Sequence, residues 1–150
     1  MRFILVILAA TVAMAEDMTD SAKLPAKEGH YNTPSEAQAV LDAVRSSYKA
    51  FYHADLPNVT MNYHFGCNQR SDLATFIASV KDEGFDQLDP SYIDDNGSDE
   101  KHLPRYGWVA GKSLPYDGQM LLDEFLKYQR IAEMAHIDFG GITPDDRQGE

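Results

Sequence analysis

The order of periodic segments in this sequence predicts an α+β domain built on a single antiparallel sheet. Residues 59–67 alternate apolar and polar side chains, as a half-buried strand does, and residues 119–135 repeat apolar side chains at helical spacing. After a leading helix at 33–54, we expect strand, helix, strand, strand, helix and strand. This is the order of the split βαβ, or ferredoxin-like, arrangement. We therefore predict a ferredoxin-like βαββαβ domain over residues 33–143, with an antiparallel four-stranded sheet preceded by an extra N-terminal helix.

The first fifteen residues are typical of a secretory signal peptide. Arg2 gives a positively charged start, an apolar run follows over residues 3–12, and Ala13-Met14-Ala15 matches the A-x-A pattern that precedes cleavage. We expect cleavage between Ala15 and Glu16. The apolar run is too short for a stable membrane span. These features predict a periplasmic or secreted protein without stable membrane insertion, and an uncleaved N-terminal anchor is the alternative.

Residues 16–32 are polar and lack apolar periodicity, so we expect a flexible N-terminus there. The leading helix should begin at Thr33, which can cap it, with Pro34 in the first helical position. Glu36 completes the pattern of a capping box, and Pro57 ends the helix because it cannot continue the hydrogen-bond ladder. The helix carries one apolar stripe, so we expect it to cover the other face of the sheet or one of its edges.

The middle of the chain gives weaker signals. A second helix is expected to begin at Ser71-Asp72 and to end at Gly84, which suits the C′ position. Residues 85–93 indicate a weaker strand that Pro90 interrupts. Residues 94–104 have the composition of a solvated loop between two strands.

The last third of the chain predicts a strand, a helix and a final strand. Residues 105–113 form the first strand, and Asp117 is a candidate cap for the helix at 119–135. The last strand covers residues 137–142 and ends at Thr143-Pro144. We expect residues 144–150 to be a disordered tail.

Charge and cysteine content narrow the function classes. The net charge of the whole chain is −11, and loss of Arg2 with the signal peptide leaves 12 basic and 24 acidic residues, a charge of −12. Such a chain repels nucleic acid and anionic lipid, and would attract a basic protein partner, although acidity can also serve solubility alone. Cys67 is the single cysteine, so no internal disulfide forms. It is a buried thiol, an intermolecular pairing site or a reactive group.

The sequence contains no recognisable catalytic or metal-binding frame. Its five histidines lack ligand spacing, and the acidic loop that begins at Asp94 does not fit a calcium loop. We therefore predict no enzyme activity, no cofactor and no metal. A candidate binding surface remains on the sheet, where a pocket could take a small ligand, or where the same residues are simply polar surface or interface positions. Its members are Asn62, His64, Tyr106 and Trp108.

Three local patterns resemble the regulator of ribonuclease activity B (RraB) family, the RNase E inhibitor domain. The helix start Asp72-Leu73-Ala74-Thr75-Phe76 and the exit Glu83-Gly84-Phe85 are similar to the first core helix of that family and the strand after it. The closing run over 126–142, with Ala132-Glu133 before Phe139 and Gly141, resembles its last helix and strand. Ile142 stands where the family has Trp, and Gly140 replaces an acidic residue. The resemblance covers most of residues 35–142.

The resemblance implies inhibition of RNase E by protein binding, with no catalytic residues. Two features depart from that role: the chain ends in the short DDRQGE in place of a long acidic tail, and RNase E is cytoplasmic whereas the signal peptide predicts export. We therefore expect an exported, non-enzymatic binding or inhibitor domain that acts on a basic protein partner. The alternative is a small-ligand-binding protein or small enzyme that uses the open sheet face around Asn62, His64 and Trp108.

Overall fold

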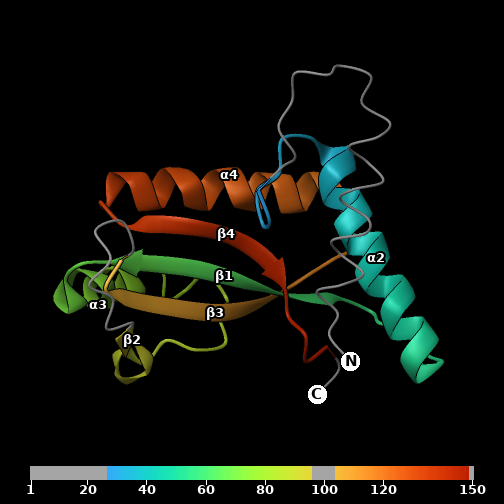
Figure 1. Ribbon diagram of the computed structural model, residues 1–150, viewed down its shortest axis with the longest axis horizontal. Coiled ribbons are helices and arrows are strands. Elements are labelled where there is room, and N and C mark those ends of the chain that lie inside the picture. The colour runs from blue at the N-terminus through green and yellow to red at the C-terminus, as the bar shows by residue number, and fades with distance from the viewer. Residues whose placement is uncertain (1–26, 96–103, 149–150) are drawn as a thin grey trace.

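The computed structural model describes residues 27–95 and 104–148 and has an α+β architecture (Figure 1). Its four strands pair antiparallel in the order β2-β3-β1-β4. The strands are β1 (Val59–Cys67), β2 (Asp94–Asp95), β3 (Tyr106–Leu114) and β4 (Asp138–Pro144). The helices are α2 (Pro34–Tyr52), α3 (Arg70–Ser79) and α4 (Gly118–Met134), with a 3₁₀ turn, η1, at Pro90–Tyr92. The α+β class and the antiparallel four-stranded sheet are confirmed.

Two predictions from the sequence concern residues outside the described ranges. The signal peptide and its cleavage site at Ala15 and Glu16 lie outside them, as does most of the acidic loop. No helix within residues 27–95 and 104–148 combines the length and the apolar character that a membrane crossing requires.

The central strand β1 has one buried face and one partly exposed face, because successive strand residues point to opposite sides. Tyr63 and Phe65 are buried in the core, whereas Asn62 and His64 are partly exposed. The strand predicted at 59–67 is confirmed with its bounds. We call the second side the open face; its members on β1 and β3 include Thr60, Asn62, His64, Val109, Gly111 and Ser113.

Helices α3 and α4 both cover the buried face. Phe65 contacts Phe76 of α3 and Tyr128 of α4, with ring centroids 4.9 Å and 6.0 Å away. The Asp117 side chain caps α4, as predicted, by accepting hydrogen bonds from the first backbone amides of the helix. Helix α3 ends at Ser79, so Gly84 is not its C′ residue, although its φ of +88° explains why glycine stands there.

Helix α2 packs against α4 rather than on the other face or an edge of the sheet, which corrects the expectation for the leading helix. In Figure 1 it stands steeply across the end of α4. The Gly118 amide donates a 2.8 Å hydrogen bond to Gln38 Oε1, and a Cβ at Gly118 would lie 2.3 Å from Pro34 O. The missing side chain lets the two helices meet this closely. Thr33 caps α2 as predicted.

The strand predicted at 85–93 is wrong. Within the described residues 85–95, the residues that pair with β3 as a strand are Asp94 and Asp95, which belong to the segment that was expected to be a loop. The 3₁₀ turn explains the difference: Pro90 starts it, and the Asp89 carboxylate accepts a 2.9 Å hydrogen bond from Ser91 N. Proline cannot donate to a strand ladder, so the chain turns away from β3 here.

Residues 27–32 are packed against the sheet, so the expected flexible N-terminus is wrong for this part of 16–32. Gly29 O accepts a 2.9 Å hydrogen bond from Ile142 N, and the buried Tyr31 hydroxyl donates one of 2.6 Å to Ile142 O. The segment thus satisfies backbone groups along the outer edge of β4.

The expected disordered tail at 144–150 is also wrong as far as residue 148. Pro144 belongs to β4, and a turn follows in which Asp145 and Gln148 are buried, 4% and 2% exposed. Asp145 N extends the pairing by donating a 3.0 Å hydrogen bond to Thr60 O. The chain therefore remains against β1 beyond its last strand.

Candidate functional site

The four residues of the predicted binding surface lie on opposite faces of the sheet. Asn62 and His64 belong to the open face, but Trp108 lies opposite Phe65 in the β1–β3 register, and Tyr106 lies opposite Cys67. Residues directly opposite in an antiparallel pair share a face, so Tyr106 and Trp108 point to the core side. A pocket that combines all four residues is excluded.

Trp108 is a core residue. Its side chain is 1% exposed and stacks on Phe65 with 5.4 Å between ring centroids, while Phe76 and Phe85 meet it edge-on. Its Nε1 has no hydrogen-bond partner among the described residues. The indole therefore contributes apolar packing rather than ligand recognition.

His64 makes a side-chain contact across the open face. Its Nε2 shares a 2.7 Å hydrogen bond with Thr143 Oγ1 of β4. Burial lowers the pKa of His64, and the nearby Glu28 carboxylate opposes this effect. The imidazole is thus held mostly neutral near pH 7 and is already bonded to a neighbour.

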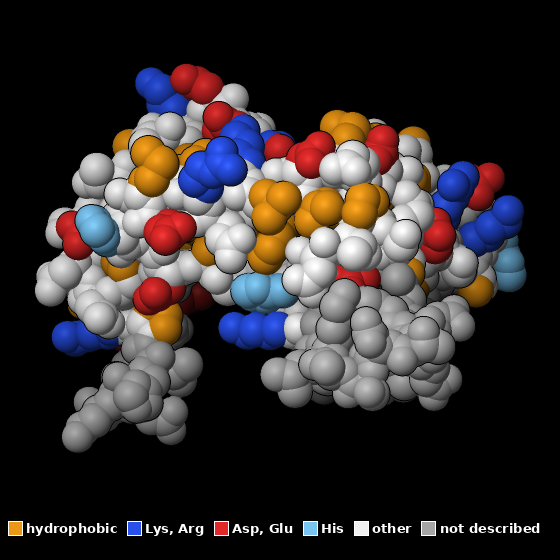
Figure 2. Space-filling view, turned by 90° about the horizontal axis from the view of Figure 1, so that it is seen from above, with side chains coloured by type: hydrophobic (Ala, Val, Ile, Leu, Met, Phe, Trp, Pro, Cys, Tyr) orange, Lys and Arg blue, Asp and Glu red, His pale blue; other side chains and the backbone are white. Residues whose placement is uncertain are grey.

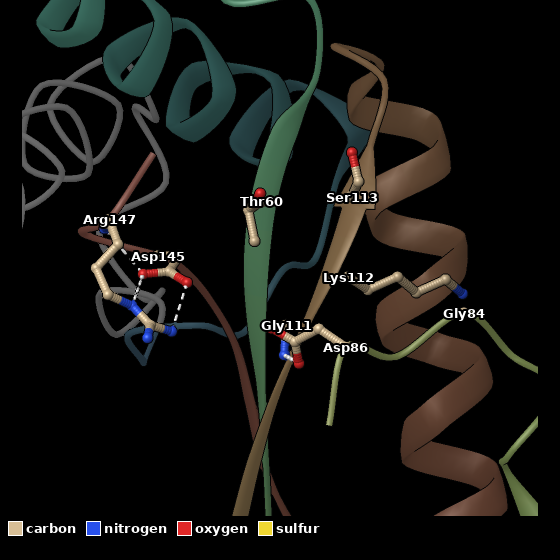
Figure 3. A pocket seen from close by; sticks show the side chains of 8 residues that line it. All are labelled: Thr60, Gly84, Asp86, Gly111, Lys112, Ser113, Asp145 and Arg147. Carbon is tan, nitrogen blue, oxygen red and sulfur yellow. Dashed lines mark hydrogen bonds and ion pairs between the residues drawn. The ribbon is translucent and has the colours of Figure 1, made fainter. Parts of the chain in front are cut away.

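A polar cleft of about 400 Å³ opens at the end of this face where β1 begins and β3 ends (Figure 3). Its lining consists of Thr60, Gly84, Asp86, Gly111, Lys112, Ser113, Asp145 and Arg147. In Figure 3, Asp145 and Arg147 lie to one side of Thr60 and Asp86 lies to the other, while the Lys112 side chain points away. The Lys112 ammonium instead donates a 2.8 Å hydrogen bond to Glu124 Oε2 on the core side.

Asp86 is fixed over β3 by two hydrogen bonds to Gly111. Its backbone amide donates to Gly111 O at 2.9 Å, and its carboxylate Oδ1 accepts from Gly111 N at 2.7 Å. A Cβ at Gly111 would lie 2.6 Å from Asp86 Oδ2. The absence of a side chain at position 111 therefore gives this carboxylate its place on the edge of the cleft.

The opposite wall is an ion pair held by the C-terminal turn. The Arg147 guanidinium donates to both Asp145 oxygens, at 3.2 Å and 3.0 Å. Burial works to raise the pKa of Asp145, but its bonds to Arg147 and the charge of that residue outweigh burial and leave the pKa below its usual range. The hydrogen bond from Arg147 to Asp145 likewise raises the pKa of Arg147, and the Asp86 charge adds a minor contribution. Asp145 therefore neutralises Arg147 locally.

Gln148 anchors this wall to the sheet. Its Oε1 accepts from Thr60 N at 2.8 Å, and its Nε2 donates to Thr60 O at 2.6 Å and to Asp145 O at 2.7 Å. The side-chain amide thus occupies the place of a neighbouring strand residue beside Thr60.

The remaining sequence candidates show structural rather than chemical roles. Cys67 is buried, and its thiol donates to Gln69 O at 2.8 Å. His30 bonds Gly140 O and packs on Phe125, and His53 ends α2 in a left-handed conformation. Across residues 27–95 and 104–148, no group of three or more histidine, cysteine, aspartate or glutamate side chains could hold a metal ion.

A second surface feature lies on the outer side of α4. Met120, Leu126 and Met134 are exposed there, at 44%, 45% and 76%. Figure 2 shows the molecule from above the view of Figure 1, with hydrophobic side chains grouped among acidic and basic ones. These three exposed side chains are apolar, whereas the cleft is lined by charged and hydroxyl-bearing residues.

Sequence reasoning missed the cleft because its charged walls come from segments that were assigned other roles. Asp86 was placed in a strand, and Asp145 and Arg147 in a disordered tail. One available signal was the position of Asp86 two residues after Gly84, where a turn can redirect a short acidic side chain onto a neighbouring strand. Comparison of the sequence with models of known protein families and with curated proteins gave no match.

Proposed function

We propose that this chain is an exported, non-enzymatic protein-binding domain of the inhibitor type, and that it binds a basic protein partner through the open face. The observation that carries the proposal is the polar cleft on that face, where Asp86 stands without an ion pair among the described residues. A net charge of −11 adds long-range attraction for a basic protein.

We also make a proposal on the topology of the fold and one on the family. We propose the ferredoxin-like topology with α2 as the extra helix, supported by the strand order β2-β3-β1-β4 and by two helices on one face. The strand β2 departs from that arrangement in length, because it has only two residues. The resemblance to the regulator of ribonuclease activity B family suggests protein binding as the mode of action, and the expected export gives this chain a partner other than RNase E.

The nature of the cleft favours a macromolecular partner over a free small ligand. Sites for small molecules are lined mainly by hydrophobic and aromatic side chains, whereas the residues that line this cleft are glycine, serine, threonine and charged residues. The two aromatic side chains proposed for a small-ligand site, Tyr106 and Trp108, point to the core side of the sheet, and Trp108 is fully buried there. Asn62, and beside it His64 bonded to Thr143, would lie at the margin of a protein interface.

The proposal is tested by affinity capture from the exported fraction with a matched pair of variants. Asn62→Arg places a long cation on the open face, opposite Gly111, which has no side chain. Met134→Arg makes the same charge change on the outer side of α4. We expect one stoichiometric partner to be retained by the wild type and Met134→Arg and lost by Asn62→Arg.

Two results would contradict the proposal. One is recovery of no stoichiometric partner by the wild type at low and moderate salt. The other is a partner that Asn62→Arg retains and Met134→Arg loses, which would move the binding surface to α4. Circular dichroism and urea unfolding of each variant verify that the fold is intact.

A further inference from the structure

The Asp86 carboxylate is preorganised to accept a cation. Its backbone amide and its Oδ1 are both bonded to Gly111, which fixes the side chain over the edge of β3. The second oxygen, Oδ2, makes no hydrogen bond to another described residue and faces the space that a Cβ at Gly111 would fill. A fixed acceptor loses little conformational entropy when a donor binds.

The charges around the cleft leave Asp86 as its uncompensated group. Arg147 is paired with Asp145 through two hydrogen bonds, and the Lys112 ammonium is bound to Glu124 on the core side. The lining carries two carboxylates, the Arg147 guanidinium and the Lys112 ammonium, and Glu124 already neutralises the ammonium, so one carboxylate is in excess. A bound cation would neutralise the net negative charge of the cleft.

The floor of the cleft adds neutral acceptors. Thr60 and Ser113 occupy directly opposite positions on β1 and β3, and both point to the open face beside Gly111. Hydroxyl oxygens accept hydrogen bonds from an ammonium or a guanidinium, which carries several donors. A cavity of about 400 Å³ leaves room for the end of a long side chain.

We propose that the cleft binds a lysine or arginine side chain of the protein partner, with Asp86 Oδ2 as the ionic acceptor and the Thr60 and Ser113 hydroxyls as secondary acceptors. This inference rests on the proposed function and names the chemistry of the partner at that site.

The test uses acetylated and amidated hexalysine and hexaarginine as probes, with hexa-(Nε-acetyl-lysine) as a probe of equal length that lacks the charge. Backbone amide shifts of Thr60 and Gly111 report binding at the cleft. Asp86→Asn keeps an oxygen that can accept from Gly111 N but removes the charge. Asp123→Asn makes the same charge change on the exposed side of α4. Asp86→Asn should weaken hexalysine binding about tenfold, as loss of one charged hydrogen bond does.

Each outcome decides the inference. Loss of the Gly111 shifts in Asp86→Asn, with little change in Asp123→Asn and none from the acetylated probe, supports it. Equal weakening in both variants, or equal binding of the acetylated probe, overturns it. If the peptides fail to bind while a partner sensitive to Asn62→Arg is still captured, the inference falls and the proposed function stands. If the peptides bind at the cleft but no partner is recovered, the proposed function falls and the cleft remains a cation site.

Discussion

The side-chain amide of Gln148 pairs with the backbone of Thr60 as a neighbouring strand would. The amide oxygen accepts from Thr60 N at 2.8 Å, and the amide nitrogen donates to Thr60 O at 2.6 Å. Gln148 lies beyond the last strand, and its side chain bonds the backbone N–H and C=O of Thr60 in the central strand. It also holds the wall of the cleft that carries Asp145.

Gln148→Ala should lower the free energy of unfolding by about 2 kcal/mol, since a backbone amide in the sheet loses its partner. Urea unfolding measures the change, and hydrogen exchange at Thr60 should accelerate. Gln129→Ala, the same change at an exposed position of α4, serves as the control and should change stability by less than about 0.5 kcal/mol. A Gln148→Ala variant as stable as this control would show that the tail does not contribute to the sheet.

Gly111→Ala should displace the Asp86 carboxylate, because the new Cβ would lie 2.6 Å from Oδ2. We expect a loss of about 1–2 kcal/mol, the scale of one charged hydrogen bond. A double-mutant cycle with Asp86→Ala measures the coupling by urea unfolding. In the Asp86→Ala background the same substitution should cost clearly less, and additive effects would contradict the described contact.

Trp108→Ala should destabilise the domain by about 3–5 kcal/mol, because it empties a fully buried aromatic site. Trp108→Phe should cost clearly less, since the stacking on Phe65 is kept and the indole N–H has no partner among the described residues to lose. Urea unfolding checks both values. Hexalysine binding by Trp108→Phe should equal that of the wild type, and a loss of binding at unchanged stability would restore Trp108 to a ligand site.

The lowered pKa of His64 predicts a pH-dependent stability. The unfolded chain takes up a proton near the ordinary value of 6.5, while the folded chain resists protonation at this site. The unfolded state therefore binds more protons in this window, and stability falls as the pH drops below about 6.5 toward the folded pKa. Denaturation curves of wild type and His64→Gln at pH 5 to 8 measure this. The pH dependence should be smaller in the variant, and parallel curves would argue against the effect.

The sequence predicted those parts of the fold in which local pattern and tertiary packing agree. The strand at 59–67 alternates because one face of β1 is buried, and α4 repeats apolar residues because one side packs on the sheet. The strand predicted at 85–93 is wrong because Asp86 alone makes the printed hydrogen bonds of this segment to β3, through its backbone amide and its carboxylate, while Phe85 contacts β3 only by packing on Trp108. A hydrogen bond made by one polar residue leaves the spacing of the apolar residues unchanged, so apolar periodicity cannot predict it.

The site was harder to predict because it depends on register. Asn62 and Trp108 each lie on the strand face that the sequence indicated, but only the pairing of Phe65 with Trp108 shows that those faces are opposite. A shift of one residue in this pairing would have joined them. Likewise, no local sequence pattern predicts that the side-chain amide of Gln148 bonds the backbone of Thr60 in place of a neighbouring strand.

The contact between Tyr31 and Ile142 has a consequence for the order of folding. The two residues are 111 positions apart in the sequence. Residues 27–32 are synthesised early, yet the groups they pack on, Phe125 of α4 and Ile142 of β4, come near the end of the sequence. Contacts of such long range slow the folding reaction. Residues 27–32 can therefore cover the outer edge of β4 only when nearly the whole chain has been synthesised. The covering of this edge is a late step, and the nascent domain reaches its native state slowly.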